Sequence, residues 1–400
     1  MNILFLSIST AISNLNNRGI YPDLLREFAD EGHAIFIVCP AERIQKLKTN
    51  LKQSNNVSTL MVQTLNITKT NILEKGISML LIDHLFSRAI QKHFGDVKFD
   101  LILYATPPIT FNGLIKKLKN KHRATTYLLL KDIFPQNAVD VGIISKQNPL
   151  YHMFRAKEKS LYTYADYIGC MSPANVDYII KNNPEIQSEK VEVCPNSIAL
   201  VSETVFDRNE IRKLYKIPID TCVCIYGGNL GKPQGIDFLL EVLSSNKNRL
   251  DVFFVIAGSG TETYRIRSFI DVEKPNNVIL FDQMPRIEFD QLLGSCDIGL
   301  IFLDKRYTIP NYPSRLLNYL EFKKPVLMAI DRNTDIGTIA DANNYGLWAE
   351  SGDLAIFNNN LNKLIRNPEL LIEMGENGYK FLVENYTVDK SYKTIMSHFS

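Results

Sequence analysis

The sequence predicts an α/β protein with two doubly wound, parallel-sheet domains in tandem. Short runs rich in β-branched and aromatic residues alternate with amphipathic helical patterns along the chain. This alternation is typical of a parallel sheet covered by helices on both faces. The pattern restarts once, after a polar stretch near residues 196–205. With 400 residues the chain exceeds the usual size of one domain, so two domains are expected.

The first half contains six apolar runs with strand character. The first run, NILFLS, is followed by the helical pattern YPDLLREFADEG, which ends near Gly32. The later runs are HAIFIVCP, DLILYA, ATTYLLL, YIGCMS and KVEVCP. We therefore expect a Rossmann-like N-terminal domain over residues 1–198.

The second half repeats this organisation. The strand pattern TCVCIYGG leads through the turn GGNLGKPQG into the helical pattern IDFLLEVL. Further strand patterns are DVFFVIAGSG, VILF, DIGLIFL and PVLMAI. We expect a second Rossmann-like domain over residues 199–386 and a C-terminal helix over 387–400 that crosses back to the first domain. Ligands of open α/β sheets bind at the carboxyl ends of the strands, so a cleft between the domains is the expected site.

The composition is that of an ordinary soluble protein, with 45% hydrophobic and 22% charged residues and a net charge of +2. This balance gives no reason to expect nucleic acid. The six cysteines are scattered, mostly in or beside apolar runs, which predicts buried reduced thiols and a reducing cytosol. MNILFLSIS has no basic leader, and no stretch is long enough to span a bilayer. We therefore expect a cytoplasmic protein.

Two glycine-rich turns in the second half suggest a bound anion. In GGNLGKPQG, Gly228 and Gly231 let the backbone approach a ligand, and Lys232 can add a positive charge. VIAGSGTETY repeats this device at Gly258 and Gly260. Each turn alone is also compatible with a tight turn that binds nothing. Because both turns follow strands of one domain, we expect them to face a common crevice.

A third feature is the helix start NYPSRLLNYLEF. Capping explains Asn311, Ser314 and the nearby Pro313. It does not require Arg315, because a helix start disfavours a cation. A bound anion removes this conflict, so together the three features predict one diphosphate-sized anion. No Asp-x-Asp motif or histidine cluster occurs, so amides, helix dipoles, Lys232 and Arg315 are expected to neutralise it without a metal.

Segments of both halves resemble family 4 glycosyltransferases of the GT-B fold, most of all their bacterial capsule and O-antigen branch. The second half carries GGNLGKPQGIDFLL, VFFVIAGSG, IFLDKRYTIPNYPSRLLNYLEFKKPVLMAI and the stretch from NNYGLWAE to GYKF. The first half is similar more weakly, through the Arg18-Gly19 turn, GHAIFIVCP, LLLKDIFPQNAVDVG, ADYIGCMSPANVDYI and KVEVCPNS.

The resemblance implies a retaining transferase. It would move a hexosyl or N-acetylhexosaminyl group from a nucleotide diphosphate sugar, usually UDP-linked, with no cofactor. The usual acceptor is a polyprenyl-diphosphate-linked saccharide at the cytoplasmic face of the cell membrane, so a peripheral location on that face is implied. The departing phosphate would take the acceptor proton, since such enzymes show no obvious side-chain nucleophile.

The chain departs from the family in the residues that hold the donor. The second glutamate of the family's Glu-x7-Glu motif falls on Asn318 and the first falls near Pro310, so neither carboxylate is present. Asn318 can still hydrogen-bond a ribose hydroxyl. Glu321 shares its helix face and is either a replacement carboxylate or a solvated surface residue. Sugar contact would then fall to the backbone near Tyr312.

The family's diphosphate-binding arginine and lysine are also replaced. They fall on Asn229 and Gln234, which leaves Lys232 and Arg315 as nearby cations. Two further residues, Gln283 and Met284, follow VILF where the family's backbone meets the base, although an ordinary strand-end turn is equally compatible.

In the first half, Lys131 and Asp132 follow a buried strand at the family's sugar-pocket position. Asp132 is expected to orient hydroxyl groups, with a turn-capping role as the alternative. Arg18 and Gly19 open the first helix as in the family's acceptor side, although Arg18 can equally be a solvated loop residue.

Residues 109–123 combine an apolar stripe with a basic run. The apolar positions at helical spacing are Phe111, Leu114, Ile115 and Leu118, and the cations are Lys116, Lys117, Lys119, Lys121 and Arg123. Such a helix can lie on anionic lipid, or it can pack its apolar side in the core and expose its basic side. SMLLIDHLFSRAIQKHF, apolar around most of its circumference, is a second candidate membrane surface.

Two other classes of function remain open. A sugar-nucleotide epimerase has the same architecture but needs no acceptor and requires an acid/base pair near the sugar. The lack of glutamate or histidine at the motif positions argues mildly against it. A non-catalytic nucleotide-sugar-binding partner in a polysaccharide assembly complex is compatible with the missing glutamate pair.

Overall fold

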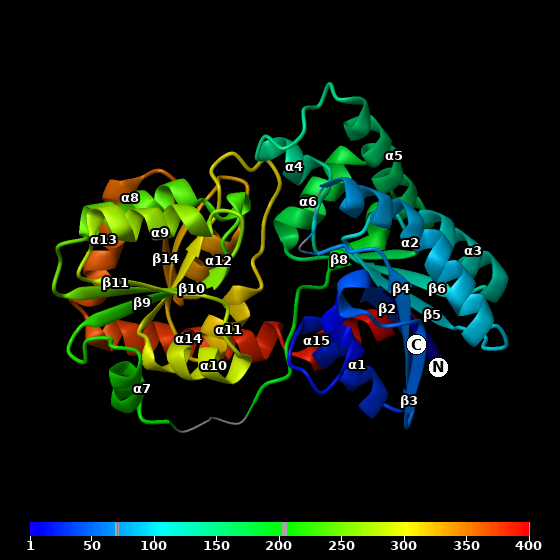
Figure 1. Cartoon of the computed structure of the whole chain (residues 1–400), viewed down its shortest axis with the longest axis horizontal. Helices are drawn as coiled ribbons and strands as arrows, with labels where there is room; N and C mark the ends of the chain where they lie inside the picture. The colour runs from blue at the N-terminus through cyan, green and yellow to red at the C-terminus, as the bar shows by residue number, and fades with distance from the viewer. Residues whose placement is uncertain (69, 71, 202–205, 400) are drawn as a thin grey trace. The chain divides into compact units, whose positions relative to one another are not determined.

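The structure is a computed structural model that describes residues 1–68, 70, 72–201 and 206–399. The chain divides into two compact units, shown in Figure 1. The first comprises Met1–Ala199 and the segment that begins at Thr387, and the second comprises Leu200–Tyr386. Each unit contains one sheet of largely parallel strands covered by helices, so the predicted α/β fold class with two parallel-sheet domains is confirmed. Residues 202–205 of the expected linker lie outside the described residues.

The sheet of the first unit has the strand order β3-β4-β2-β1-β5-β6-β7-β8. Among the described strand pairs of this sheet, β3–β4 alone is antiparallel. Its strands are β1 Asn2–Leu6, β2 Ala34–Glu42, β3 Asn50–Ser54, β4 Val57–Thr64, β5 Leu101–Ala105, β6 Thr125–Leu129, β7 Tyr167–Cys170 and β8 Val191–Val193. The sequence analysis missed β3 and β4. β3 lies at the edge with almost every residue exposed, so its sequence NLKQS lacks an apolar face.

Seven α-helices of the described chain belong to this unit. They are α1 Ile20–Asp30, α2 Ile72–His93, α3 Asn112–His122, α4 Gln136–Asp140, α5 Pro149–Tyr164, α6 Pro173–Asn182 and α15 Val388–Met396. α1 and α15 pack on one face of the sheet, where Phe28 and Ile395 join the core around Phe5. α2 contacts α3 through Phe86 and Phe111, whose ring centres are 5.6 Å apart.

The apolar stripe of residues 109–123 belongs to the core. Phe111, Leu114, Ile115 and Leu118 are each at most 4% exposed. The core-packing alternative is therefore correct for this stripe, and only the basic side of α3 faces outward. None of the described helices is both long enough and apolar enough to cross a membrane.

The sheet of the second unit has the order β11-β10-β9-β12-β13-β14, and its strand pairs are all parallel. Its strands are β9 Cys222–Asn229, β10 Val252–Ser259, β11 Val278–Phe281, β12 Ile298–Phe302, β13 Val326–Ile330 and β14 Gly346–Glu350. Its helices are α7 Arg208–Leu214, α8 Ile236–Asn246, α9 Thr263–Glu273, α10 Arg286–Ser295, α11 Arg315–Glu321, α12 Ile336–Ala342, α13 Leu354–Ile365 and α14 Pro368–Asn385. α8, α9 and α13 share one apolar core with the sheet. The strand order reverses between β9 and β12, which marks the edge where such sheets bind ligands.

Candidate functional site

The predicted anion-binding residues of the second unit lie at the carboxyl ends of β9, β10 and β12. Gly228 and Asn229 end β9, and Gly258 and Ser259 pair with them in register at the end of β10. After β12 the chain runs to α11, which begins with Arg315. The structure therefore brings these predicted features to the strand-order reversal of one sheet.

Arg315 lies at this edge of the sheet, against β9 and the turn that follows it. Its Nη2 donates to the Gln234 side-chain oxygen at 2.6 Å, and its guanidinium carbon lies 4.2 Å from the centre of the Tyr226 ring. A Cβ on Gly228 would lie 3.7 Å from the guanidinium. Nη1 is buried, and no described residue accepts a hydrogen bond from it. A cation with neutral partners and one unsatisfied buried donor is suited to an anion.

Two tyrosines hold this cation in place. The Tyr319 hydroxyl accepts from the Gly227 amide at 3.0 Å and donates to the Leu300 carbonyl at 3.1 Å, which fixes α11 against β9 and β12. The Tyr226 hydroxyl donates to the Asn229 carbonyl at 2.8 Å and so shapes the turn after β9. Sequence reasoning missed both tyrosines. The available signal was the four-residue spacing that places Tyr319 on the same helix face as Arg315.

The glycines of the two turns have different roles. A Cβ on Gly258 would lie 1.8 Å from the Gly228 carbonyl oxygen, and one on Gly260 would lie 2.3 Å from the Leu230 carbonyl oxygen. These two glycines are required because the turns touch each other, whether or not a ligand binds. Gly231 is buried beside the exposed Lys232.

A hydrogen bond joins the turn before α11 to the turn after β13. The Asn311 amide donates to Thr334 Oγ1 at 2.9 Å, whereas the Asn311 side-chain nitrogen is buried without a partner among the described residues. The Pro313 carbonyl accepts from the Leu316 amide. Ser314 stands at the N-cap position but makes no side-chain capping bond, so the capping role expected for it is wrong.

Other predicted donor residues also make internal contacts. The Tyr312 hydroxyl contacts the Tyr386 hydroxyl, so this ring is oriented by the end of the second unit. Glu321 Oε1 accepts from the Val201 amide at 3.3 Å, which favours a structural role over a replacement carboxylate.

Asn318 has a partner that the sequence analysis did not predict. Arg286 Nη2 donates to Asn318 Oδ1 at 2.9 Å, and Arg286 Nε donates to Asp290 at 2.9 Å. Arg286 begins α10, two residues after Met284 and three after the exposed Gln283. It therefore links the loop predicted to meet the base with the side chain predicted to meet the ribose. Because Asn318 Oδ1 accepts from Arg286, the side-chain amide nitrogen is the group of Asn318 that could donate to a ligand.

In the first unit, Lys131 and Asp132 follow β6, and both their amides donate to Thr106 Oγ1. Lys131 Nζ donates to the Cys194 carbonyl at 3.0 Å, and burial lowers its pKa. Asp132 Oδ1 accepts from the Asn137 amide at 2.6 Å, while burial raises the pKa of Asp132 to about 6.

The start of α1 lies near this carboxylate. The pKa of Tyr21 is raised by burial and by the charge of Asp132. Arg18 donates to the Ala199 carbonyl at 3.5 Å, and the Gly19 amide donates to Asp23 at 3.1 Å. The helix start predicted for the acceptor side and Asp132 therefore belong to one neighbourhood of the first unit.

Substitution of Asp132 by Asn is expected to stabilise the protein above neutral pH. In the unfolded chain this carboxyl group ionises near 3.8, and in the folded chain near 6, so ionisation costs stability as the pH rises between these values. The gain of Asp132→Asn over wild type should therefore be small near pH 4, grow up to about pH 6–7, and reach about 3 kcal/mol. Urea unfolding of both proteins across this range measures it. A gain that is equal at both ends would contradict the pKa shift.

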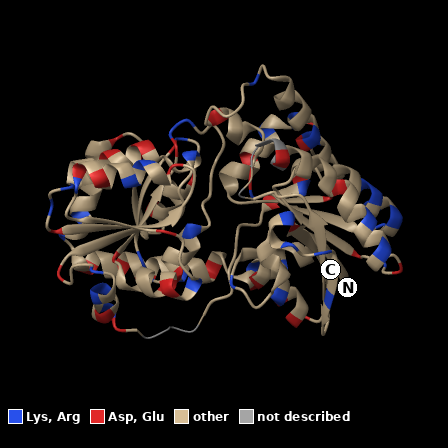
Figure 2. Ribbon diagram, in the orientation of Figure 1, with Lys and Arg blue, Asp and Glu red and all other residues tan. Residues whose placement is uncertain are grey.

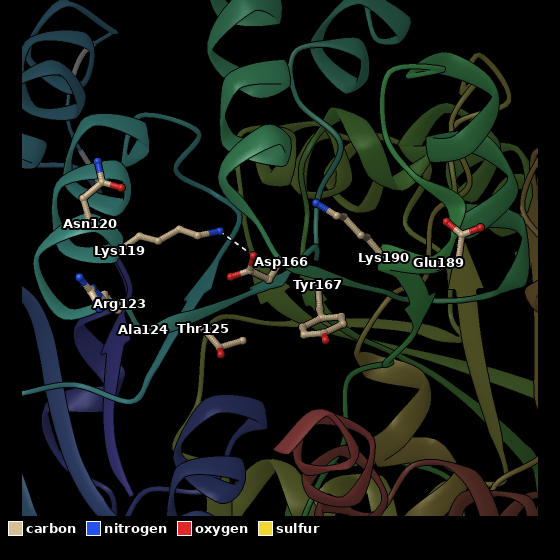
Figure 3. Close-up of a pocket in the computed structure, with 9 residues that line it drawn as sticks. All are labelled: Lys119, Asn120, Arg123, Ala124, Thr125, Asp166, Tyr167, Glu189 and Lys190. Atoms are coloured by element: carbon tan, nitrogen blue, oxygen red, sulfur yellow. Dashed lines mark hydrogen bonds and ion pairs between the residues drawn. The ribbon is translucent and has the colours of Figure 1, made fainter. Parts of the chain in front are cut away.

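A hollow of about 810 Å³ lies at the opposite, amino edge of the first unit's sheet (Figure 3). Thr125 and Tyr167, which begin β6 and β7, line it together with Lys119 and Asp166, whose ion pair measures 2.6 Å. None of the predicted site residues lines this hollow. Among the residues that the structure describes, no three His, Cys, Asp or Glu side chains gather as metal ligands.

Two parallel-sheet α/β units are the architecture of the GT-B fold. Solved glycosyltransferase structures of this fold cover 98–100% of the chain. The structure of HepE from Anabaena in complex with UDP has a TM-score of 0.70 and 14% identity, and covers 100% of this chain and 99% of that protein.

Within this class, residues 207–381 match the family model for glycosyl transferases group 1. WbjE of Pseudomonas aeruginosa, named a probable glycosyltransferase, is 22% identical over 70% of this chain and 68% of its own. WcaI of Escherichia coli K12, named for colanic acid biosynthesis, is 21% identical over 64% of this chain and 65% of its own. The chain is thus similar to group 1 glycosyltransferases over its second unit, and to relatives named as glycosyltransferases over about two thirds of its length.

Proposed function

We propose that this protein transfers a hexosyl or N-acetylhexosaminyl group from a UDP-linked donor to a lipid-linked saccharide, with retention and without a metal, in bacterial surface polysaccharide synthesis. The observation that carries the proposal is the Arg315 guanidinium, which keeps one buried N–H group unpaired at the carboxyl edge of the second unit's sheet. The UDP complex of HepE and the colanic acid function in the name of WcaI support the choice of donor and of pathway class.

The donor diphosphate is assigned to the turn after β9 and to the start of α11. Arg315 would donate to its oxygens, with Lys232 and the amides around Gly228 and Asn229 adding positive potential. Asn318, oriented by Arg286, would meet the ribose, and Gln283 and Met284 the base. The sugar itself would lie against the turn at Tyr312–Ser314.

The acceptor is assigned to the first unit, around Asp132, Lys131, Arg18 and Gly19. In the proposed step an acceptor oxygen forms a bond to the anomeric carbon on the face from which the donor phosphate leaves. The bond from that carbon to the phosphate oxygen breaks, and the departing phosphate takes the acceptor proton. Arg315 stabilises the charge that develops on this leaving group.

Thermal shift against UDP-, GDP- and dTDP-linked sugars tests the donor assignment. The donor should raise the melting temperature further with each increase in its concentration, because ligand bound only to the folded state stabilises it by about 2.7 kcal/mol at one hundred times its Kd. Incubation of the stabilising donor with a polyprenyl-diphosphate saccharide should then give an extended product with the donor's anomeric configuration. Conversion of the donor to an epimer without acceptor, or binding with no turnover on any acceptor, would overturn the transferase assignment.

A further inference from the structure

One exposed stripe of the first unit is apolar at one end and basic at the other. It runs along α2 at helical spacing. Its apolar end consists of Ile77, Leu80 and Leu81, which are 52%, 55% and 44% exposed. Large apolar side chains that gather on an exposed surface mark a site of interaction.

The same stripe continues with basic side chains. His84, Arg88 and Lys92 follow at four-residue steps and, with Lys117 of α3, line a hollow of about 330 Å³ between the two helices. Lys117 Nζ donates a hydrogen bond to Ser87 Oγ at 2.9 Å, which holds the lysine side chain across the hollow. No carboxylate lines the hollow. Figure 2 shows Lys and Arg gathered on α3 and on the neighbouring part of α2.

The one acidic residue of this part of α2 is turned away from the stripe. Asp83 accepts from the Leu114 amide at 2.7 Å, at the start of α3. The charge of Asp83 acts on His84 and Lys117 and offsets part of the positive charge of the hollow. Arg88 and Lys92 lie further along the stripe, and the exposed Lys116 and Lys121 of α3 add positive charge.

We infer that this α2–α3 surface docks on a lipid bilayer that carries anionic headgroups. Ile77, Leu80 and Leu81 enter the boundary between headgroups and acyl chains, while Arg88, Lys92 and Lys117 contact lipid phosphates. A bilayer with anionic headgroups offers acyl chains to the apolar end and phosphates to the cations. The presence of both parts on one surface therefore favours a bilayer over nucleic acid or an acidic protein. The inference rests on the proposed function in one respect, because it names the surface that brings the first unit to a membrane-held acceptor.

Co-sedimentation of the full chain with vesicles tests the inference. The protein should bind vesicles of phosphatidylcholine with phosphatidylglycerol, bind phosphatidylcholine alone much more weakly, and be released by salt. Arg88→Gln with Lys92→Gln and Lys117→Gln should lower the partition coefficient on the order of 100-fold, at roughly fivefold for each cation. Leu80→Glu with Leu81→Glu should lower it on both kinds of vesicle.

Matched variants separate this surface from charge and hydrophobicity in general. Lys46→Gln with Lys48→Gln and Lys52→Gln removes three exposed cations near β3, and Leu250→Glu replaces an apolar residue that is 79% exposed in the second unit. Both controls should bind vesicles within about twofold of wild type, because neither changes a residue of the α2–α3 surface. Equal loss in the controls, or no binding to anionic vesicles, would overturn the inference. Dimerisation through the stripe, removed by Leu80→Glu, would also overturn it. UDP-sugar thermal shift on the same preparations shows separately whether the donor assignment stands.

Discussion

Replacement of Arg315 by Ala is expected to lower kcat/KM for the nucleotide sugar by about 10²–10³-fold, the loss typical of removing one donor that stabilises a developing charge. The guanidinium is held by Gln234 and Tyr226, and its Nη1 group is buried without an acceptor. A diphosphate oxygen bound to Nη1 would accept a strong, charge-assisted hydrogen bond. Steady-state turnover of the donor identified by thermal shift measures the effect.

Three comparisons make this result specific. Arg315→Lys should recover only part of the activity, because an ammonium group cannot reproduce the planar fork of donors. Lys232→Ala should cost less than about tenfold, because Lys232 is exposed and screened by solvent. Arg249→Ala, at the amino edge of the same sheet, should retain wild-type kcat/KM. Unchanged turnover in a folded Arg315→Ala, Lys232→Ala double variant would remove the proposed anion-binding site.

The sequence predicted the parts of the fold that depend on local pattern. Buried parallel strands such as β1, β9 and β12 are continuous apolar runs, and those runs were recognised. The edge strand β3 was missed because exposed strands need no apolar face. β14 was also missed, since GLWAE mixes buried and half-buried positions over five residues and resembles a loop.

Residues of the candidate site were likewise predictable only where the local sequence pattern reveals them. Arg315 was predicted because its position conflicts with the helix dipole, which is visible in the sequence alone. Arg286 and Tyr319 were not, because their contacts with Asn318 and with the Gly227 amide join segments 32 and 92 residues apart. No local pattern encodes such pairs. The anion-binding role of Gly258 stays a prediction, since a ligand and a neighbouring turn impose the same requirement for glycine.

Replacement of Gly258 by Ala is expected to be the most damaging single-methyl change at this edge. The new Cβ would lie 1.8 Å from the Gly228 carbonyl oxygen and 2.9 Å from its carbonyl carbon, and these backbone atoms cannot rotate away. The ends of β9 and β10 must separate, which breaks their register at Gly258 and Ser259. Such overpacking against backbone should cost about 3 kcal/mol or more in the free energy of unfolding. Urea denaturation measures this loss.

The matched control is Gly76→Ala, a helical position in α2 where an added Cβ meets nothing within 4 Å. It should raise stability by roughly 0.4–1 kcal/mol, because alanine restricts the unfolded chain without strain in the helix. A fully stable Gly258→Ala protein would mean that the turns after β9 and β10 do not touch as described. Their contact holds Gly228 close to the Arg315 guanidinium. A variant that retains its fold but loses the thermal shift with UDP-sugar would therefore tie donor binding to the spacing of these two strand ends.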